Sequence, residues 1–248
     1  AIPVCDHYSG APERMQKSLQ LQAAMTAEFG VCVFDVTLDC EDGAAVGAEA
    51  EHAALVAQLA QRAAPEARVA ARVHPVDHPA FAGDVATIAG EAGHRLCHVM
   101  LPKCESVDDV LAAERALERA GAQTLPLHVL IESPAAVQQA FVIAAHPRVQ
   151  SLSFGLMDFV SAHAGAISAS AMGSVGQFEH PLVVRAKLEI ASACHAHGKV
   201  PSHCVVTEFS DLAALRRAAQ QACSRFGFTR MWSIHPKQIL PIVEAMRP

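Results

Sequence analysis

Short apolar, β-branched runs alternate with longer Ala-rich segments of helical periodicity along the whole chain. The runs that predict strands are a short one near Pro3–Asp6, then Val31–Asp39, Arg68–His74, Cys97–Pro102, Leu127–Glu132, Val149–Phe154, Lys199–His203 and Arg230–His235. The segments that predict helices are Pro12–Phe29, Ala48–Ala64, Pro79–Ala92, Val107–Ala120, Ala135–Ala145, Pro181–His197, Asp211–Phe226 and Pro236–Met246. This alternation is typical of parallel βα units and predicts an α/β fold.

Eight strand–helix pairs in 248 residues match the size of a TIM (β/α)8 barrel, and a doubly wound open sheet is the alternative. Two observations favour the barrel. No strand is followed by GxGxxG or GxxxxGK[ST], the phosphate-binding turns of open sheets. Strand after strand ends in polar residues, which a barrel gathers on one rim. We expect one domain, 1–248, with the Gly, Ser and Ala-rich loop Leu156–His180 as a lid over that rim.

Composition excludes several classes of protein. Apolar residues make up 52% and charged residues 18%, below the roughly 25% of an average protein, so the chain is not disordered. It has neither a long apolar run nor a signal segment, which predicts a soluble, cytoplasmic protein with no membrane partner. The net charge of −6, without a basic block, excludes nucleic acid as a partner. Eight cysteines without CxxC spacing are expected to be reduced.

Carboxylates at neighbouring strand ends are the main chemical signal. Glu132 and Asp158 follow the fifth and sixth predicted strands, so their side chains should lie together at the rim. Two carboxylates with water and an oxygen-rich substrate suit Mg²⁺, which prefers hard oxygen ligands. Asp39, Glu41 and Asp42 add negative charge after the second strand. The alternative is that Glu132 and Asp158 only cap helices in βα loops.

Two cationic residues complement these acids. Arg72 interrupts an apolar strand, and a buried guanidinium needs carboxylates or an anionic substrate. A structural ion pair with Asp39 or Glu41 is its alternative role. Lys103, after the fourth strand, has the right position for a Schiff-base lysine, but a carboxylate such as Glu105 nearby would raise its pKa and disfavour that chemistry.

The order of these motifs resembles the HpcH/HpaI aldolase and citrate lyase β-subunit family. The series is LDCEDG (residues 38–43), RVHP (72–75), LPKCES (101–106), LIES (130–133), FGLMD (154–158), SHCVVTEFSD (202–211) and GFTRMWSIHPKQI (227–239). The last element is similar to the branch that handles acyl-CoA thioesters. The resemblance covers the chain from the second strand to its end.

This resemblance implies a Mg²⁺-dependent TIM barrel that makes or breaks a carbon–carbon bond. The two products would be a 2-oxo acid and the enolate of an acyl thioester, carried on CoA or on an acyl carrier. By position, Glu132 and Asp158 would ligate Mg²⁺. Arg72 would stabilise the developing enolate or carbonyl oxygen.

The resemblance also implies supporting roles near the metal. Glu132 and Lys103 would contact the substrate together with Arg72. Glu41 and Asp42 are further catalytic candidates. Together with Asp39 they would orient Arg72 and the water bound to the metal. Active sites of the family lie near subunit contacts, so a homo-oligomer is expected.

Several positions depart from the family pattern. Where the family usually has LDLEDA, this chain has LDCEDG, with Cys40 and Gly43. Where the family has RVN, this chain has His74 in the third position. The family's I-D-G-V after the seventh strand is replaced by residues 202–205. The chain stops about one helix after IHP, whereas relatives extend further, some with a tail that contributes an acidic residue to a neighbouring subunit. Whether such a tail exists and which residue is the general base are therefore both left open.

Three functions remain open at this point. The first is cleavage or formation of a citryl-CoA or malyl-CoA type thioester. The second is an aldolase acting on a free 2-oxo acid, or a thioesterase, on the same fold. The third, from another class, is a non-catalytic barrel subunit, although an idle site would keep a carboxylate pair and a buried Arg at a cost to stability.

Overall fold

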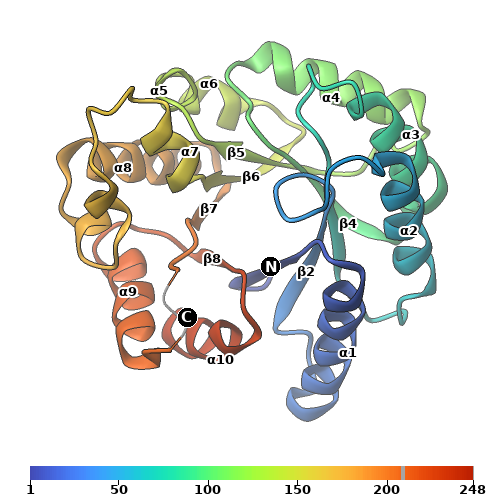
Figure 1. The fold of residues 1–248 in the computed structure, drawn as a ribbon, viewed down its shortest axis with the longest axis horizontal. Helices are drawn as coiled ribbons and strands as arrows, with labels where there is room; N and C mark the ends of the chain where they lie inside the picture. The colour runs from blue at the N-terminus through green and yellow to red at the C-terminus, as the bar shows by residue number, and fades with distance from the viewer. Residues whose placement is uncertain (208–209, 248) are drawn as a thin grey trace.

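Eight parallel strands close into a barrel in chain order, and helices form a ring around it (Figure 1). The computed structural model describes residues 1–207 and 210–247. The strands are β1 (Cys5–Ser9), β2 (Phe34–Asp39), β3 (Val69–Arg72), β4 (Leu96–Leu101), β5 (Leu127–Ile131), β6 (Val149–Phe154), β7 (Val200–His203) and β8 (Arg230–Ser233). The predicted TIM barrel is confirmed, and β1 begins and ends later than predicted.

The helices lie between successive strands. They are α1 (Pro12–Phe29), α2 (Glu49–Arg62), α3 (Phe81–Ala92), α4 (Val107–Arg119), α5 (Pro134–Gln138), α6 (Ala140–Ala145), α7 (Leu156–Ser161), α8 (Pro181–His197), α9 (Leu212–Ser224) and α10 (Pro236–Ala245), with 3₁₀ helices η1 (Gly93–Arg95), η2 (Ala169–Met172) and η3 (Gly176–Phe178). Among the described residues, none of these helices is both long and apolar enough to cross a bilayer.

Two predictions about elements were wrong in detail. The helix expected over Ala135–Ala145 is two short helices, because the backbone of Gln139 leaves the helical region at φ −94° and ψ 3°. The segment expected to be a long loop, Leu156–His180, contains α7, η2 and η3. Its Phe159 and Phe178 are buried, so apolar anchors attach much of the segment to the barrel.

Local sequence explains where several helices begin and end. α1 begins with Pro12 in its first turn and ends at Gly30, which adopts φ 73° and donates its N–H to Thr26 O. α5 begins after Ser133, whose Oγ accepts a hydrogen bond from Ala136 N at 3.1 Å. These signals place the βα loops, and with them the rim.

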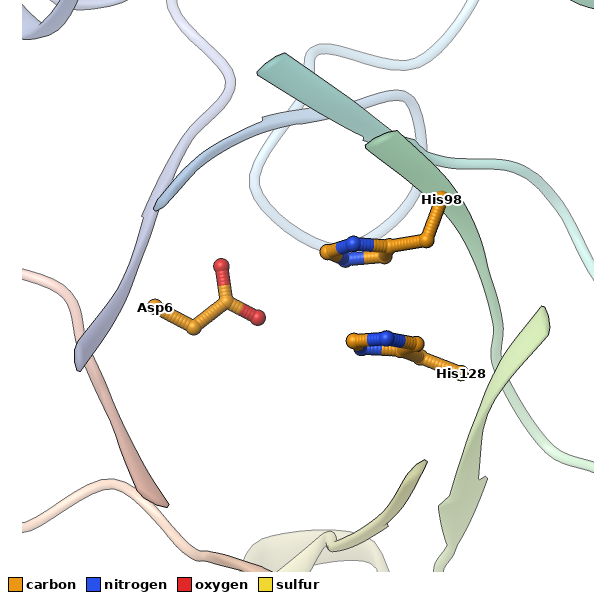
Figure 2. A group of neighbouring side chains, drawn as sticks. All are labelled: Asp6, His98 and His128. Carbon is orange, nitrogen blue, oxygen red and sulfur yellow. The ribbon is translucent and has the colours of Figure 1, made fainter. Parts of the chain in front are cut away.

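The barrel interior carries a layer of polar side chains near its N-terminal end. Asp6 projects inward from β1, and His98 of β4 and His128 of β5 face it from the opposite wall (Figure 2). The two imidazole rings stack with centroids 3.4 Å apart and an interplanar angle of 6°. All three side chains are buried.

Ion pairs balance the charge of this layer. Arg230 Nη2 lies 2.8 Å from Asp35 Oδ2 and 3.3 Å from Asp6 Oδ2, and Arg68 Nε lies 2.5 Å from Asp35 Oδ1. Two carboxylates thus face two guanidiniums. Because a buried ion without a partner is very costly, this pairing makes a charged barrel core possible.

An apolar layer separates these charges from the rim. It consists of Tyr8, Met100, Leu130, Val205 and Trp232, all buried. The ring centroids of Tyr8 and Trp232, the only Tyr and the only Trp of the chain, lie 4.9 Å apart. This layer forms the floor of the site at the C-terminal rim.

Candidate functional site

Arg72, the last residue of β3, is buried in the barrel mouth and clamped onto Asp39 at the end of β2. Its Nε donates to Asp39 Oδ1 at 2.8 Å and its Nη2 to Asp39 Oδ2 at 2.5 Å, while Nη1 lies 3.5 Å from Glu41 Oε1. Burial acts to raise the pKa of Asp39, but the hydrogen bonds and charge of Arg72 outweigh it and hold the pKa below its usual value. The ion pair considered as an alternative is present, and it fixes the guanidinium at the rim.

The loop after β2 folds closely around Asp39. The carboxylate also accepts hydrogen bonds from the backbone N–H of Glu41 at 2.9 Å and of Gly43 at 2.8 Å. A Cβ added to Gly43 would lie 2.4 Å from Asp39 Oδ2. Glycine, the departure from the family's usual alanine, therefore suits the close approach of this loop.

Glu132 directly follows β5 and is 6% exposed. Its Oε2 accepts a hydrogen bond from Lys103 N at 2.7 Å. A Cβ added to Gly155 would lie 2.5 Å from Glu132 Cγ, so only glycine leaves room for this side chain. Burial, with the neighbouring carboxyl of Asp158, raises the pKa of Glu132 to about 8.

Asp158 lies in the first turn of α7, four residues beyond the last residue of β6, and not at the strand end itself. Its side chain is 41% exposed. Its carboxyl group nevertheless lies close enough to Glu132 to help raise the pKa of that residue. The expectation that these two carboxyl groups lie near each other agrees with this arrangement. The alternative role as helix caps is not seen: the N-cap of α5 is Ser133, and that of α7 is Gly155.

Lys103 places its ammonium among acids of two segments, the loop after β2 and α7. Its Nζ lies 2.7 Å from Glu41 Oε2, 3.6 Å from Asp42 Oδ2 and 3.7 Å from Asp158 Oδ2. Partial burial acts to lower the pKa of Lys103, but Glu41 outweighs it, and the pKa is raised above its usual value. A permanently charged ammonium cannot attack a carbonyl group, which agrees with the argument against a Schiff base.

The carboxyl pair of Glu132 and Asp158 fits a divalent cation. Both supply oxygen ligands, and they approach each other closely enough to oppose ionisation of the buried one. A cation between them would remove that cost. These two residues are the ones that could hold Mg²⁺ at this rim.

A cavity of about 690 Å³ opens beside Arg72. Tyr8 and Trp232 belong to its lining, and Arg14 and Lys17 of α1 bring two cations to it. Glu132 and Asp158 are not among its lining residues. They connect to the cavity through Glu41, which contacts both Arg72 and Lys103.

Sequence reasoning did not place Arg14, Lys17, Tyr8 or Trp232 in this cavity. Arg14 and Lys17 lie three residues apart on α1, so they share a helix face. Arg14 stands in the PER segment that follows the first strand, which was a usable signal. The pairing of Tyr8 with Trp232 joins the first and last strands, and no local pattern indicates it.

Two histidines at the rim have partners within the protein. His74 Nδ1 lies 2.6 Å from Asp84 Oδ2. His235 caps α10 by accepting a hydrogen bond from Lys237 N at 3.1 Å, and it also borders the cavity. In the SHCVVTEFSD motif, residues 208 and 209 lie outside the described residues.

A second group with metal-binding side chains is the buried set Asp6, His98 and His128 (Figure 2). Lone pairs of imidazole nitrogens lie in the ring plane, and two parallel rings cannot direct them at one ion. Arg230 lies 3.3 Å from the Asp6 carboxylate, which opposes a dication there. We interpret this set as part of the ion-paired barrel core.

The family model for HpcH/HpaI aldolase/citrate lyase matches residues 18–236. The chain belongs to this family. The resemblance noted in the motifs is therefore confirmed, and the rim with Arg72, Glu132 and Asp158 lies within the matched region.

The curated relatives share a name. L-malyl-CoA/beta-methylmalyl-CoA lyase of Cereibacter sphaeroides is 30% identical over 232 residues, which cover 86% of this family member and 71% of that protein. The enzyme of the same name from Rhodobacter capsulatus is 29% identical over 195 residues, covering 71% and 60%.

Solved structures agree with the fold. A citrate lyase of Burkholderia xenovorans is 48% identical with a TM-score of 0.91, covering 100% of this chain and 78% of that one. The citrate lyase beta subunit of Mycobacterium tuberculosis, complexed with oxaloacetate and magnesium, is 22% identical with a TM-score of 0.78, covering 100% and 98%. At that identity the likeness concerns the fold alone.

Proposed function

We propose that this chain is a Mg²⁺-dependent carbon–carbon lyase that cleaves or forms 3-hydroxyacyl thioesters of the malyl-CoA or citryl-CoA type. The observation that carries the proposal is the rim itself. The Arg72 guanidinium is fixed by two hydrogen bonds to Asp39. Glu41 and Lys103 connect it to the carboxyl pair of Glu132 and Asp158. The names of the curated relatives support the same reaction.

Glu132 and Asp158 would hold the metal. Bound there, Mg²⁺ would supply positive charge to the oxygens of the 2-oxo acid fragment. Cleavage also moves the electron pair of the broken carbon–carbon bond onto the thioester, which becomes an enolate. Arg72 is already rigid and desolvated, so it would stabilise that charge without reorganising.

Proton transfer requires a carboxylate that can reach the substrate. The 3-hydroxyl group must lose its proton as the carbon–carbon bond breaks. Asp42 borders the cavity with a side chain that is 62% exposed, and we assign it as the candidate acceptor. Glu41, held between Arg72 and Lys103, would orient both cations.

The outer cavity suits a phosphate-bearing thioester. Arg14 and Lys17 offer two cations on one face of α1, in the lining of the same cavity as Arg72. This charge favours CoA or an acyl carrier over a free 2-oxo acid.

We further infer that the protein works as a homo-oligomer in the cytoplasm. Family active sites near subunit contacts support the first part. All eight cysteines lie in the described residues as free thiols, which suits a reducing compartment.

The experiment is cleavage of malyl-CoA, β-methylmalyl-CoA, citramalyl-CoA and citryl-CoA by the purified protein, with Mg²⁺ and then with excess chelator. We expect release of a 2-oxo acid that the chelator abolishes. Release of free CoA without carbon–carbon cleavage would indicate a thioesterase instead. Silence across the panel without metal binding would indicate a non-catalytic barrel.

A further inference from the structure

The ammonium group of Lys103 lies near three acidic side chains at the rim. Lys103 Nζ lies 2.7 Å from Glu41, 3.6 Å from Asp42 and 3.7 Å from Asp158. An ammonium has three N–H donors, so a single lysine can satisfy acids from different directions. Lys103 thus provides positive charge at the carboxylates that the proposed function assigns to the metal and its surroundings.

The backbone of the same residue contacts the fourth acid. Lys103 N donates to Glu132 Oε2 at 2.7 Å. Its φ of 50° is in the left-handed region, which only one other non-glycine residue, Ala164, adopts within the described chain. Such a conformation is unfavourable for lysine and persists only where surrounding contacts impose it. The hydrogen bond to Glu132 is such a contact, and it places the side chain over the acids.

The two cations of the site differ in freedom. The Arg72 side chain is 7% exposed and held by Asp39, whereas that of Lys103 is 42% exposed. A lysine stem of four carbons can rotate into solvent while its backbone remains in place. Lys103 can therefore withdraw its charge, and Arg72 cannot.

A divalent cation on Glu132 and Asp158 would lie within a few ångströms of the present position of this ammonium. Like charges at that distance repel strongly where water is partly excluded. Binding of the cation thus requires the ammonium to leave, and its lost contacts reduce the affinity.

We propose that Lys103 is a displaceable counter-cation of the metal site, which holds the acids in place before the metal binds and lowers the affinity for the metal. The inference rests on the proposed metal site. It predicts that removal of the Lys103 side chain increases the affinity for the metal. Loss of a residue that only supports the fold, or that helps to hold the metal, would leave the affinity unchanged or weaken it.

The test is titration of the purified protein with Mn²⁺, followed by the electron paramagnetic resonance signal of the free ion, and with Mg²⁺ by calorimetry. We expect Lys103→Met to bind either ion about tenfold more tightly than wild type. Lys103→Arg, which keeps the charge, should stay within roughly twofold. Lys237→Met removes the same charge from an exposed position on α10 and should also leave the affinity unchanged.

Equal or weaker binding by Lys103→Met would overturn the inference and leave the metal site standing. Binding that persists unchanged in both Glu132→Gln and Asp158→Asn would overturn the metal site, and the inference with it. Circular dichroism confirms that each variant is folded, and Lys103→Gln replaces the methionine variant if that one does not fold.

Discussion

At the scale of single residues, the two carboxylates of the candidate site differ in what they contribute to the fold. Glu132 is buried and tied to the backbone of Lys103, whereas Asp158 is substantially exposed. Replacing Glu132 therefore disturbs packing as well as chemistry. Asp158 is the residue at which function can be tested with little effect on stability.

We predict that Asp158→Asn lowers Mg²⁺-dependent turnover at least about a hundredfold, because an amide is a poorer ligand and removes a charge where the metal would bind. The free energy of unfolding should change by less than about 1 kcal/mol, as for most exposed positions. Turnover is measured with the best thioester of the panel, and stability by urea unfolding. Glu105→Gln, at an exposed acid of the neighbouring loop, is the control and should keep full activity. Full activity of Asp158→Asn would contradict the assignment of this residue to the metal.

At the scale of elements, the site depends on how closely the loop after β6 passes the end of β5. Gly155 joins β6 to α7 and leaves space for Glu132. We predict that Gly155→Ala weakens Mg²⁺ binding by at least about tenfold, because the added methyl group must push Glu132 or α7 away. Calorimetric titration with Mg²⁺ measures this.

Gly83→Ala is the matched control for that change. A Cβ at Gly83 in α3 meets no atom within 4 Å, so this variant should keep its metal affinity and gain up to about 1 kcal/mol of stability. If Gly155→Ala bound Mg²⁺ as wild type does, the close approach would have no role in placing Glu132.

Hydrophobic periodicity predicted most helices and strands of the barrel correctly. It did not predict the split between α5 and α6 or the short helices after β6. Seven of the expected helical segments contain one helix of the structure, since apolar residues at helical spacing bury one face of each. The segment after β6 was expected to be a loop because it is rich in Gly, Ser and Ala. Its short helices depend on tertiary anchors such as Phe159 and Phe178, which a composition argument does not weigh.

At the scale of the whole molecule, the buried histidines make stability depend on pH. Burial, with the charge of Arg230, holds the pKa of His98 and of His128 well below the usual value of 6.5. Below about pH 6.5 the unfolded chain binds protons at these positions and the folded barrel does not. The free energy of unfolding should therefore fall as pH decreases, by up to about 1.4 kcal/mol per pH unit for each histidine.

We predict that urea unfolding between pH 7.5 and pH 5 shows this loss of stability. In His98→Met the free energy of unfolding should depend less steeply on pH, because up to one proton fewer is taken up on unfolding. The same experiment on His128→Gln checks the second ring. His94→Gln, at an exposed histidine of η1, is the control and should keep the wild-type slope. A slope that is the same in all variants would show that the stacked pair does not titrate on unfolding.

The sequence by itself determined the α/β alternation, favoured a closed barrel over an open sheet, and placed Arg72, Asp39 and Glu132 at the ends of strands. These follow from local rules, because strand and helix periodicity decides which faces are buried and parallel strands all end on one rim. Only the tertiary structure decided that Lys103 lies among the acids, that Tyr8 and Trp232 form the floor, and that α1 brings Arg14 and Lys17 to the cavity. Those contacts join segments far apart in the chain, and they depend on strand register and on loop conformations that no short stretch of sequence specifies.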